Sequence, residues 1–171
     1  NWCQEMNLKM VLVGGYDSWR VSNILLEKNI PVIIEETYKV PYRSWEAYDT
    51  PFTLASKLSN LGIKYCLATN NSDFSATNTR NLPYQAAMAA SFGLSKEEAI
   101  KAITIYPAQI MGVDNKVGSL EVNKEATLIV TNGNPLEITT NVEMAFIQGK
   151  TVSLNSKHTI FYDKYQQKYN K

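Results

Sequence analysis

Asp73, near the middle of the chain, has the sequence surroundings of an active-site carboxylate. It follows the apolar run 63–69 within a few polar residues, and the start of a helix follows at 81–83. This order predicts a β-strand whose carboxyl end places Asp73 at a cleft, where α/β barrels collect their catalytic side chains. A solvated or turn-forming aspartate fits the spacing equally well, so spacing alone leaves both interpretations open.

Polar side chains after the other two apolar runs are candidates for substrate binding. Glu35 and Glu36 follow the second run; because strand side chains alternate, at most one of them points into a barrel, where it could meet a substrate amine. Tyr16 follows the first run and could line the same cleft, whereas its neighbour Asp17 fits a helix cap better. Arg80 could bind a substrate carboxylate through two hydrogen bonds, or simply lie on the surface.

Composition excludes several classes of protein. The net charge is +1, and the basic residues are spread out and matched by acids, which argues against a nucleic-acid surface. No apolar run approaches the roughly 20 residues that cross a bilayer. Cys3 and Cys66 make neither a metal motif nor a disulfide framework. His158 has no partner at ligand spacing and is expected on the surface. We expect a soluble protein, with bacterial periplasm and cytoplasm both open.

The first 80 residues alternate strand and helix. Apolar runs at 8–13, 30–34 and 63–69 predict strands, and the segments 18–28 and 52–60 between them predict helices. This alternation is typical of parallel strands joined by crossover helices. The long segment 37–50 is rich in aromatic residues, and loops of this length are often functional; it is either a substrate lid or a packed loop.

The rest of the chain changes from helices to strands. A helix is expected over 83–92, with Asn81 before it as a cap. Further helices are expected from Ser95, whose pattern with Glu98 is a capping box, and from Pro107 to Gly112. Strands and a final polar helix follow, and their expected ranges are 126–130, 142–147, 151–154 and 157–169. The second and third of these strands flank Gln148-Gly149-Lys150 and predict a hairpin.

Four segments resemble a known family when they are taken in order. They are 81–87, 93–108, 118–130 and 146–152. Together they are similar to the C-terminal part of the amidohydrolase superfamily, close to its imidazolonepropionase-like and dipeptidase-like metal-dependent hydrolases. The resemblance covers almost the whole chain, and the second and third segments are its most specific parts.

The resemblance implies an α/β fold made of the last three (β/α) units of a TIM-type barrel, followed by a small β-sandwich portion and a C-terminal helix. Residues 1–112 would be the C-terminal part of the barrel with its trailing helices, and 113–171 the sandwich segment and helix. The apolar runs 8–13, 30–34 and 65–69 would be barrel strands six to eight. Strands one to five would precede Asn1.

The resemblance also implies chemistry that depends on one or two divalent metal ions in the full-length parent, with zinc as the first candidate. It leaves open that this chain by itself binds no metal. Asp73 would be both metal ligand and catalytic proton shuttle. The family's strand-six histidine should lie near Gly14 and Gly15, but no histidine is there. Asn123 and Thr127 replace the family's usual Gly and Asp; Asn tolerates the left-handed conformation, so that change is mild.

Three functional hypotheses follow. The first is a hydrolase of amide or cyclic amide C–N bonds whose substrate is a small molecule or short peptide. The second is a degenerate family member that binds a small ligand without cleaving it, which the missing histidine favours. The third is an inactive proteolytic fragment, because the chain begins at Asn1 rather than Met. In each case we expect no nucleic-acid or membrane partner, and either a homo-oligomer or association with the missing N-terminal half.

Overall fold

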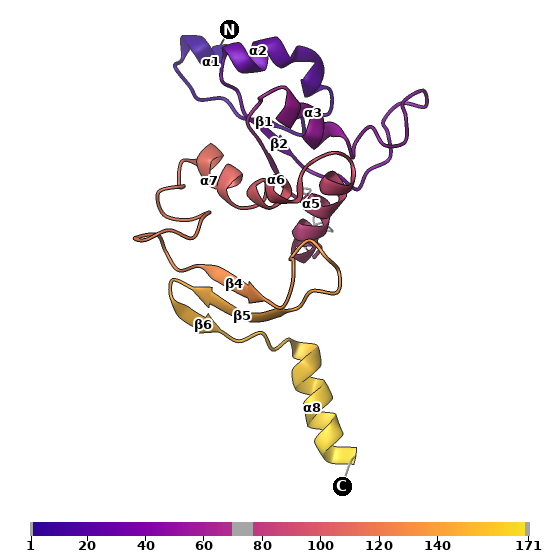
Figure 1. Ribbon diagram of the computed structural model, residues 1–171, viewed down its shortest axis with the longest axis vertical. Coiled ribbons are helices and arrows are strands. Elements are labelled where there is room, and N and C mark those ends of the chain that lie inside the picture. Colours follow the sequence, from indigo (N-terminus) through magenta and orange to yellow (C-terminus); the bar gives the residue numbers. More distant parts are fainter. Residues whose placement is uncertain (1, 70–76, 170–171) are drawn as a thin grey trace.

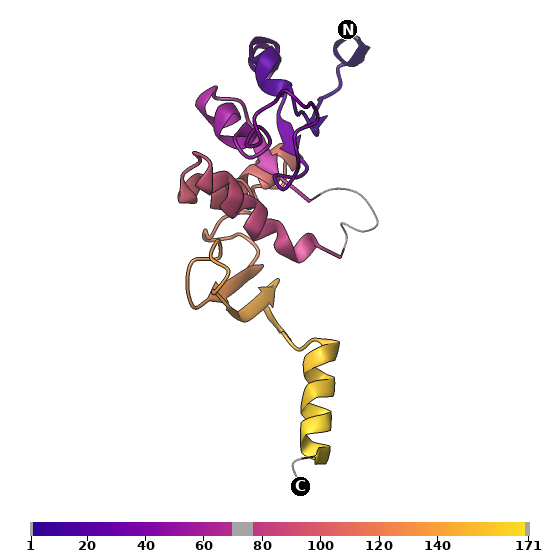
Figure 2. The same cartoon turned by 90° about the vertical axis from the view of Figure 1, so that its right-hand side faces the viewer.

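The computed structural model of the protein describes residues 2–69 and 77–169, so Asp73 lies outside the described residues. The described residues form two three-stranded sheets, one parallel and one antiparallel. The molecule is elongated, with its termini at opposite ends and the parallel sheet nearer the N-terminus (Figure 1). A short helix, α1 (Trp2–Glu5), lies apart from the body at the N-terminal end (Figure 2).

The first sheet confirms the three predicted parallel strands. Its strands lie in the order β1 (Leu12–Val13), β2 (Val32–Ile34) and β3 (Tyr65–Leu67). Each strand is shorter than the apolar run that predicts it. In β1 the reason is the missing neighbour: β1 is an edge strand, so the residues before Leu12 have no second strand to pair with and are exposed.

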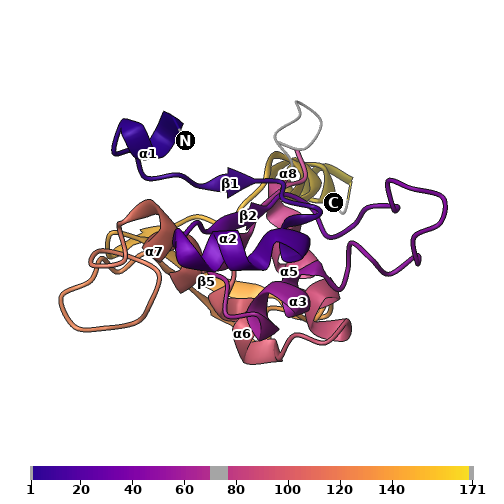
Figure 3. The ribbon, with the colours of Figure 1, turned by 90° about the horizontal axis from the view of Figure 1, so that it is seen from above.

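The core lies on one face of this sheet. Helices α2 (Ser22–Glu27) and α3 (Leu54–Asn60) cover that face together (Figure 3). Val32 and Ile34 of β2 are 0% and 2% exposed beneath them, because alternate strand residues point to the same side. On β1, Val13 is 57% exposed. On the same face Cys66 of β3 is 3% exposed. The sheet is therefore covered at β3 and open at its β1 edge, whereas parallel sheets are normally covered on both faces throughout.

Three helices follow the first sheet: α5 (Leu82–Ser91), α6 (Lys96–Lys101) and α7 (Ile105–Met111). The predicted start of α6 is confirmed, since the Ser95 hydroxyl accepts a 3.1 Å hydrogen bond from the Glu98 amide. Helix α7 starts two residues before Pro107, which is tolerated there because the first-turn amides of a helix need no carbonyl partner. Gly112 ends it with φ 70°, as predicted.

The two predicted side-chain caps at Asp17 and Asn81 are wrong. Neither residue makes a side-chain hydrogen bond to the helix that it precedes. In both places a turn of 3-10 helix comes first, at Ser18–Val21 and Thr79–Asn81. The predicted single helix over 18–28 is therefore a 3-10 turn followed by α2, and the Asp17 carboxylate is free to bind arginine.

The second sheet contains β4 (Leu128–Thr131), β5 (Val142–Ile147) and β6 (Lys150–Val152) in antiparallel order. The predicted hairpin between the last two strands is confirmed. Gln148 and Gly149 both have positive φ, 51° and 77°, as a tight two-residue turn requires. Asn123 also has a positive φ of 73°, which confirms that asparagine takes a left-handed position here.

Helix α8 (Lys157–Tyr169) matches the range predicted for the final helix. It projects from the second sheet away from the rest of the molecule (Figures 1 and 2). All of its described side chains are exposed, including Phe161 and Tyr165. In residues 2–69 and 77–169, no helix combines the length and the apolar composition that a membrane span requires.

Candidate functional site

The carboxyl ends of the three parallel strands meet at one edge of the first sheet, and two hollows lie beside this edge. The smaller has a volume of about 130 Å³ and lies between the ends of β1 and β2, the loop 37–50 and the start of α3. The larger, about 870 Å³, lies between the loop after β2, helix α5 and the segment after β4. Glu36 lines both hollows.

A turn of two glycines carries the chain out of β1. Gly14 and Gly15 have φ values of 85° and 56°, which residues other than glycine rarely adopt. A Cβ atom on Gly15 would lie 2.8 Å from Cγ1 of Val32, so only glycine lets the turn approach β2 this closely. The turn delivers Tyr16 and Asp17 to the strand end, next to the loop.

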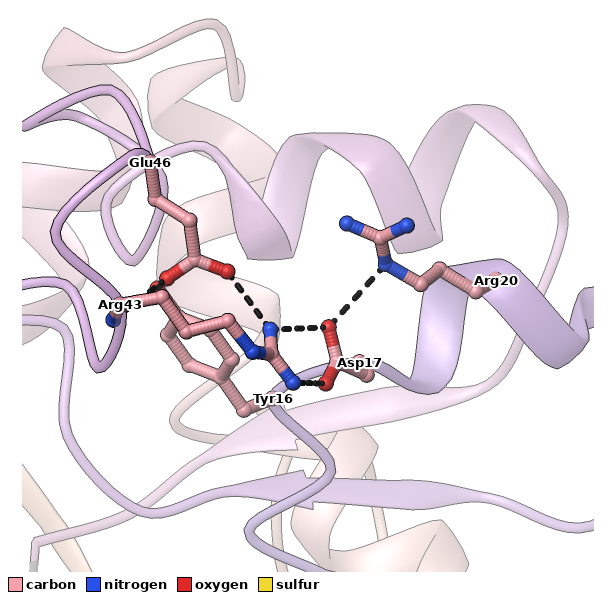
Figure 4. A network of polar contacts seen from close by, with 5 residues as sticks. All are labelled: Tyr16, Asp17, Arg20, Arg43 and Glu46. Carbon is pink, nitrogen blue, oxygen red and sulfur yellow. Dashed lines mark hydrogen bonds and ion pairs between the residues drawn. The ribbon is translucent and has the colours of Figure 1, made fainter.

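Arg43 ties the loop to this strand end (Figure 4). Its guanidinium donates to both oxygens of Asp17, at 3.1 and 2.5 Å, and to Glu46 at 2.7 Å. Tyr16 donates its hydroxyl to the same Glu46 carboxylate at 2.8 Å. Arg20 adds a further contact, from Nε to Asp17 at 3.1 Å. Two-oxygen arginine–carboxylate pairing fixes direction as well as distance, so the middle of the loop is held in one orientation.

The charges in this network hold each other in their ionised forms. Hydrogen bonds from Arg43 lower the pKa of Asp17 below its ordinary value. Burial raises the pKa of Glu46, but hydrogen bonds from Arg43 and Tyr16 outweigh it and the net direction is down. The pKa of Tyr16 rises through burial and its bond to Glu46. These groups are therefore poor proton acceptors or donors near neutral pH, and their arrangement serves to position the loop.

Glu35 differs from the carboxylates of the network. It is half-buried, and its Oε2 atom lies 3.7 Å from the position that a Cβ on Gly14 would take. Within the described part of the chain, no hydrogen bond or ion pair is found for it. Lys39 lines the same small hollow, but its ammonium group contacts Tyr42, at 3.3 Å from the hydroxyl. Glu35 therefore presents an unneutralised negative charge to the hollow.

A second anchor fixes the loop to helix α5. The Gln85 side-chain oxygen accepts from the backbone amides of Thr37 and Tyr38, at 2.8 and 3.1 Å, and from the Thr37 hydroxyl at 2.5 Å. Thr37 is 1% exposed. Sequence reasoning did not single out Gln85, although it lies in the segment 81–87; a polar residue inside an otherwise apolar helix start was the available signal.

The predicted site residues are only partly brought together. Tyr16 and Glu35 line the same small hollow. Arg80 is exposed in the 3-10 turn before α5 and is not among the residues lining either hollow. Asp73 lies outside the described residues. The substrate-binding roles of Tyr16, Glu35 and Arg80 and the catalytic role of Asp73 remain predictions.

The described residues do not form a metal site by themselves. Among residues 2–69 and 77–169, no group of three or more His, Cys, Asp or Glu side chains could hold an ion. The end of β1 carries the Arg43 network where the resemblance places a histidine, and His158 lies on the remote helix α8. A metal bound at this edge would need ligands from outside the described residues.

Comparison with known proteins identifies the family. The model of the amidohydrolase family matches residues 46–160. The chain belongs to the amidohydrolase family. Members of this family are generally metal-dependent. Imidazolonepropionase of Flavobacterium psychrophilum is 34% identical over 97 residues, which are 56% of this chain and 22% of that protein. The chain therefore spans about a fifth of that curated relative.

Several solved structures have the same fold as this chain. An amidohydrolase from Thermotoga maritima matches with a TM-score of 0.76 and 28% identity, over 88% of this chain and 38% of that one. A Xaa-Pro dipeptidase with bound methionine matches with a TM-score of 0.61 and 17% identity, over 84% and 40%. A zinc-bound adenosine deaminase from Xanthomonas campestris has a TM-score of 0.59 and 13% identity, over 96% and 44%. The α/β fold is thus that of the family.

Proposed function

We propose that this amidohydrolase-family chain is the C-terminal part of a metal-dependent hydrolase that cleaves an amide or cyclic amide C–N bond, with a small peptide among the candidate substrates. The family match over residues 46–160 carries the proposal. It is supported by the similarity to an imidazolonepropionase and by the fold shared with a Xaa-Pro dipeptidase. In this proposal β1, β2 and β3 are the last three strands of a barrel.

The site would lie at the carboxyl edge of the first sheet. Asp73 would follow β3 there, as the proposed catalytic carboxylate and metal ligand. Tyr16 and Glu35 would form the wall contributed by β1 and β2, and Arg80 would lie nearby before α5. The metal, with zinc as the first candidate, would lower the pKa of a bound water in the complete protein. The described residues supply no step through that metal, since they do not form its site.

One observation favours a second candidate, a family member that binds a small ligand without hydrolysing it. The resemblance places a metal-binding histidine at the end of β1, but the residues there are Gly14, Gly15, Tyr16 and Asp17. Asp17 is engaged by two arginines. A complete two-metal site would then be missing a ligand in the parent protein, unless another residue replaces it.

One face of the first sheet is open at its β1 edge, and this supports a proposal about partners. Val13 is 57% exposed and Val11 is 36% exposed on the edge strand and its approach. An open strand edge with exposed apolar residues favours association. We therefore propose that this face binds either the remaining half of the barrel or a second copy of the chain.

Metal content of the protein expressed from its intact reading frame tests the proposed function. One or two divalent ions per chain, together with hydrolysis of amide substrates that Asp73→Ala abolishes, is the expected result. Glu143→Gln, an exposed carboxylate on β5, is the matched control and should leave both measurements unchanged. If no metal binds even after reconstitution, the hydrolase is refuted and the ligand-binding alternative is favoured.

A further inference from the structure

We propose that the small hollow between β1, β2 and the loop 37–50 selects ligands that carry a protonated amine, with Glu35 as the specificity-determining residue. The inference rests on the proposed function for the reaction, and it adds the class of substrate. It implies that the preferred amide substrates have a free amino group on the part that enters this hollow.

The distribution of charge around the hollow is the first reason. Asp17 and Glu46, the neighbouring carboxylates at the strand end, are neutralised by Arg43. Glu35 has no such partner in the part of the chain that the structure describes, and its Oε2 atom lies over Gly14. An incoming ammonium group would therefore find one carboxylate that is free to bind it.

The position of Lys39 is the second reason. It is the one cation among the described lining residues, and its ammonium is held by Tyr42, 3.3 Å from the hydroxyl and 5.7 Å from the ring centroid. It thus leaves Glu35 unpaired. Because Lys39 is close enough to line the same hollow, its charge should oppose a second cation there.

The size and walls of the hollow define the part of the ligand that fits. A volume of about 130 Å³ is about four times the share of one water in the liquid, ~30 Å³, and so holds a short primary amine. Ile34, Pro51 and Leu54 give the hollow an apolar side for an aliphatic stem. Because the Gln85 anchor fixes the start of the loop and the Arg43 anchor fixes its middle, the wall is already in place before a ligand binds.

Binding of n-butylammonium and its neutral analogue 1-butanol tests the inference in the protein expressed from its intact reading frame. Titrations are followed by nuclear magnetic resonance through the amides of Gly14 and Gly15, which report binding at this hollow. We expect the wild type to prefer the ammonium by about two- to fivefold, the range that one exposed or half-exposed ion pair supplies. Glu35→Gln should remove that preference, and Lys39→Met should increase it. Glu143→Gln should leave it unchanged.

The outcomes separate this inference from the proposed function. Equal binding of the two probes to the wild type, or an unchanged preference in Glu35→Gln, overturns the inference even if the protein hydrolyses amides. Preference for the ammonium without any hydrolysis supports the inference and refutes the hydrolase. If the protein does hydrolyse peptides, Glu35→Gln should raise KM for substrates with a free amine and leave KM for their N-acetylated forms unchanged.

Discussion

Replacement of Gln85 by leucine should weaken the fold through the loop that forms the wall of the site. The Gln85 oxygen accepts three hydrogen bonds, from two backbone amides and the hydroxyl of Thr37. In the variant the Thr37 hydroxyl can still donate to the Gln85 backbone oxygen, at 2.9 Å. The Thr37 amide cannot find another acceptor because the residue is 1% exposed. The Tyr38 amide belongs to an exposed residue and can turn to water.

The expected loss of unfolding free energy has two parts. The buried Thr37 amide without an acceptor costs about 1–3 kcal/mol, and the Tyr38 amide that exchanges its partner for water costs about 0.5–1.5 kcal/mol. We expect a total of about 3 kcal/mol in urea denaturation. Gln109→Leu makes the same chemical change at an exposed position on α7 and should cost less than about 0.5 kcal/mol. Equal effects of the two substitutions would refute the reasoning, because Gln85 would then not anchor the loop.

Three further predictions concern acid stability, a close glycine contact and association. Arg43→Met should reduce the decrease in unfolding free energy that occurs below about pH 4. The two carboxylates paired with Arg43 have lowered pKa values in the fold. The stabilisation that they supply is therefore complete above their ordinary pKa of about 4 and disappears as the pH falls through the lowered values. Lys64→Met, at an exposed lysine without an ion pair among the described residues, is the control for urea titrations at pH 7 and pH 3. Gly118→Ala should lower the unfolding free energy by more than about 2 kcal/mol, because the new Cβ would lie 2.8 Å from the Cβ of Ala108 and the backbone has φ 98°. Gly62→Ala is the control: it has φ 71° but open space around it, and should cost about 1 kcal/mol. Sedimentation of the 171-residue chain should show self-association, and a compact monomer would contradict the open-face interpretation.

The element order could be predicted from the sequence because local patterns dominate it. The apolar runs, the Ser95 cap and the Gln148-Gly149 turn each depend on residues close together in the chain. The capping of α2 and α5 could not be predicted in the same way. The Asp17 side chain has a partner 26 residues away, Arg43, and that long-range ion pair competes with the local cap.

In the candidate site, too, the features that depend on local sequence could be predicted, and the contacts between distant residues could not. That Tyr16 and Glu35 line one hollow follows from parallel strands, whose carboxyl ends share an edge. The Thr37–Gln85 anchor joins residues 48 positions apart, and nothing in either local pattern pairs them. Glu35 has no partner among the described residues because Arg43 and Lys39 make other contacts, and its local sequence does not predict those contacts.

The end of β1 bears on the choice between the two candidate functions more directly than family membership does. The Arg43 network holds Asp17 and Glu46 in ion pairs, and a carboxylate held by arginine competes poorly as a metal ligand. A metal that took these carboxylates would leave the Arg43 charge without a counter-ion in the middle of the loop. If the proposed hydrolase is correct, we therefore expect its metal to be bound without help from the end of β1. Arg43→Met should then change the position of the loop but not the metal content.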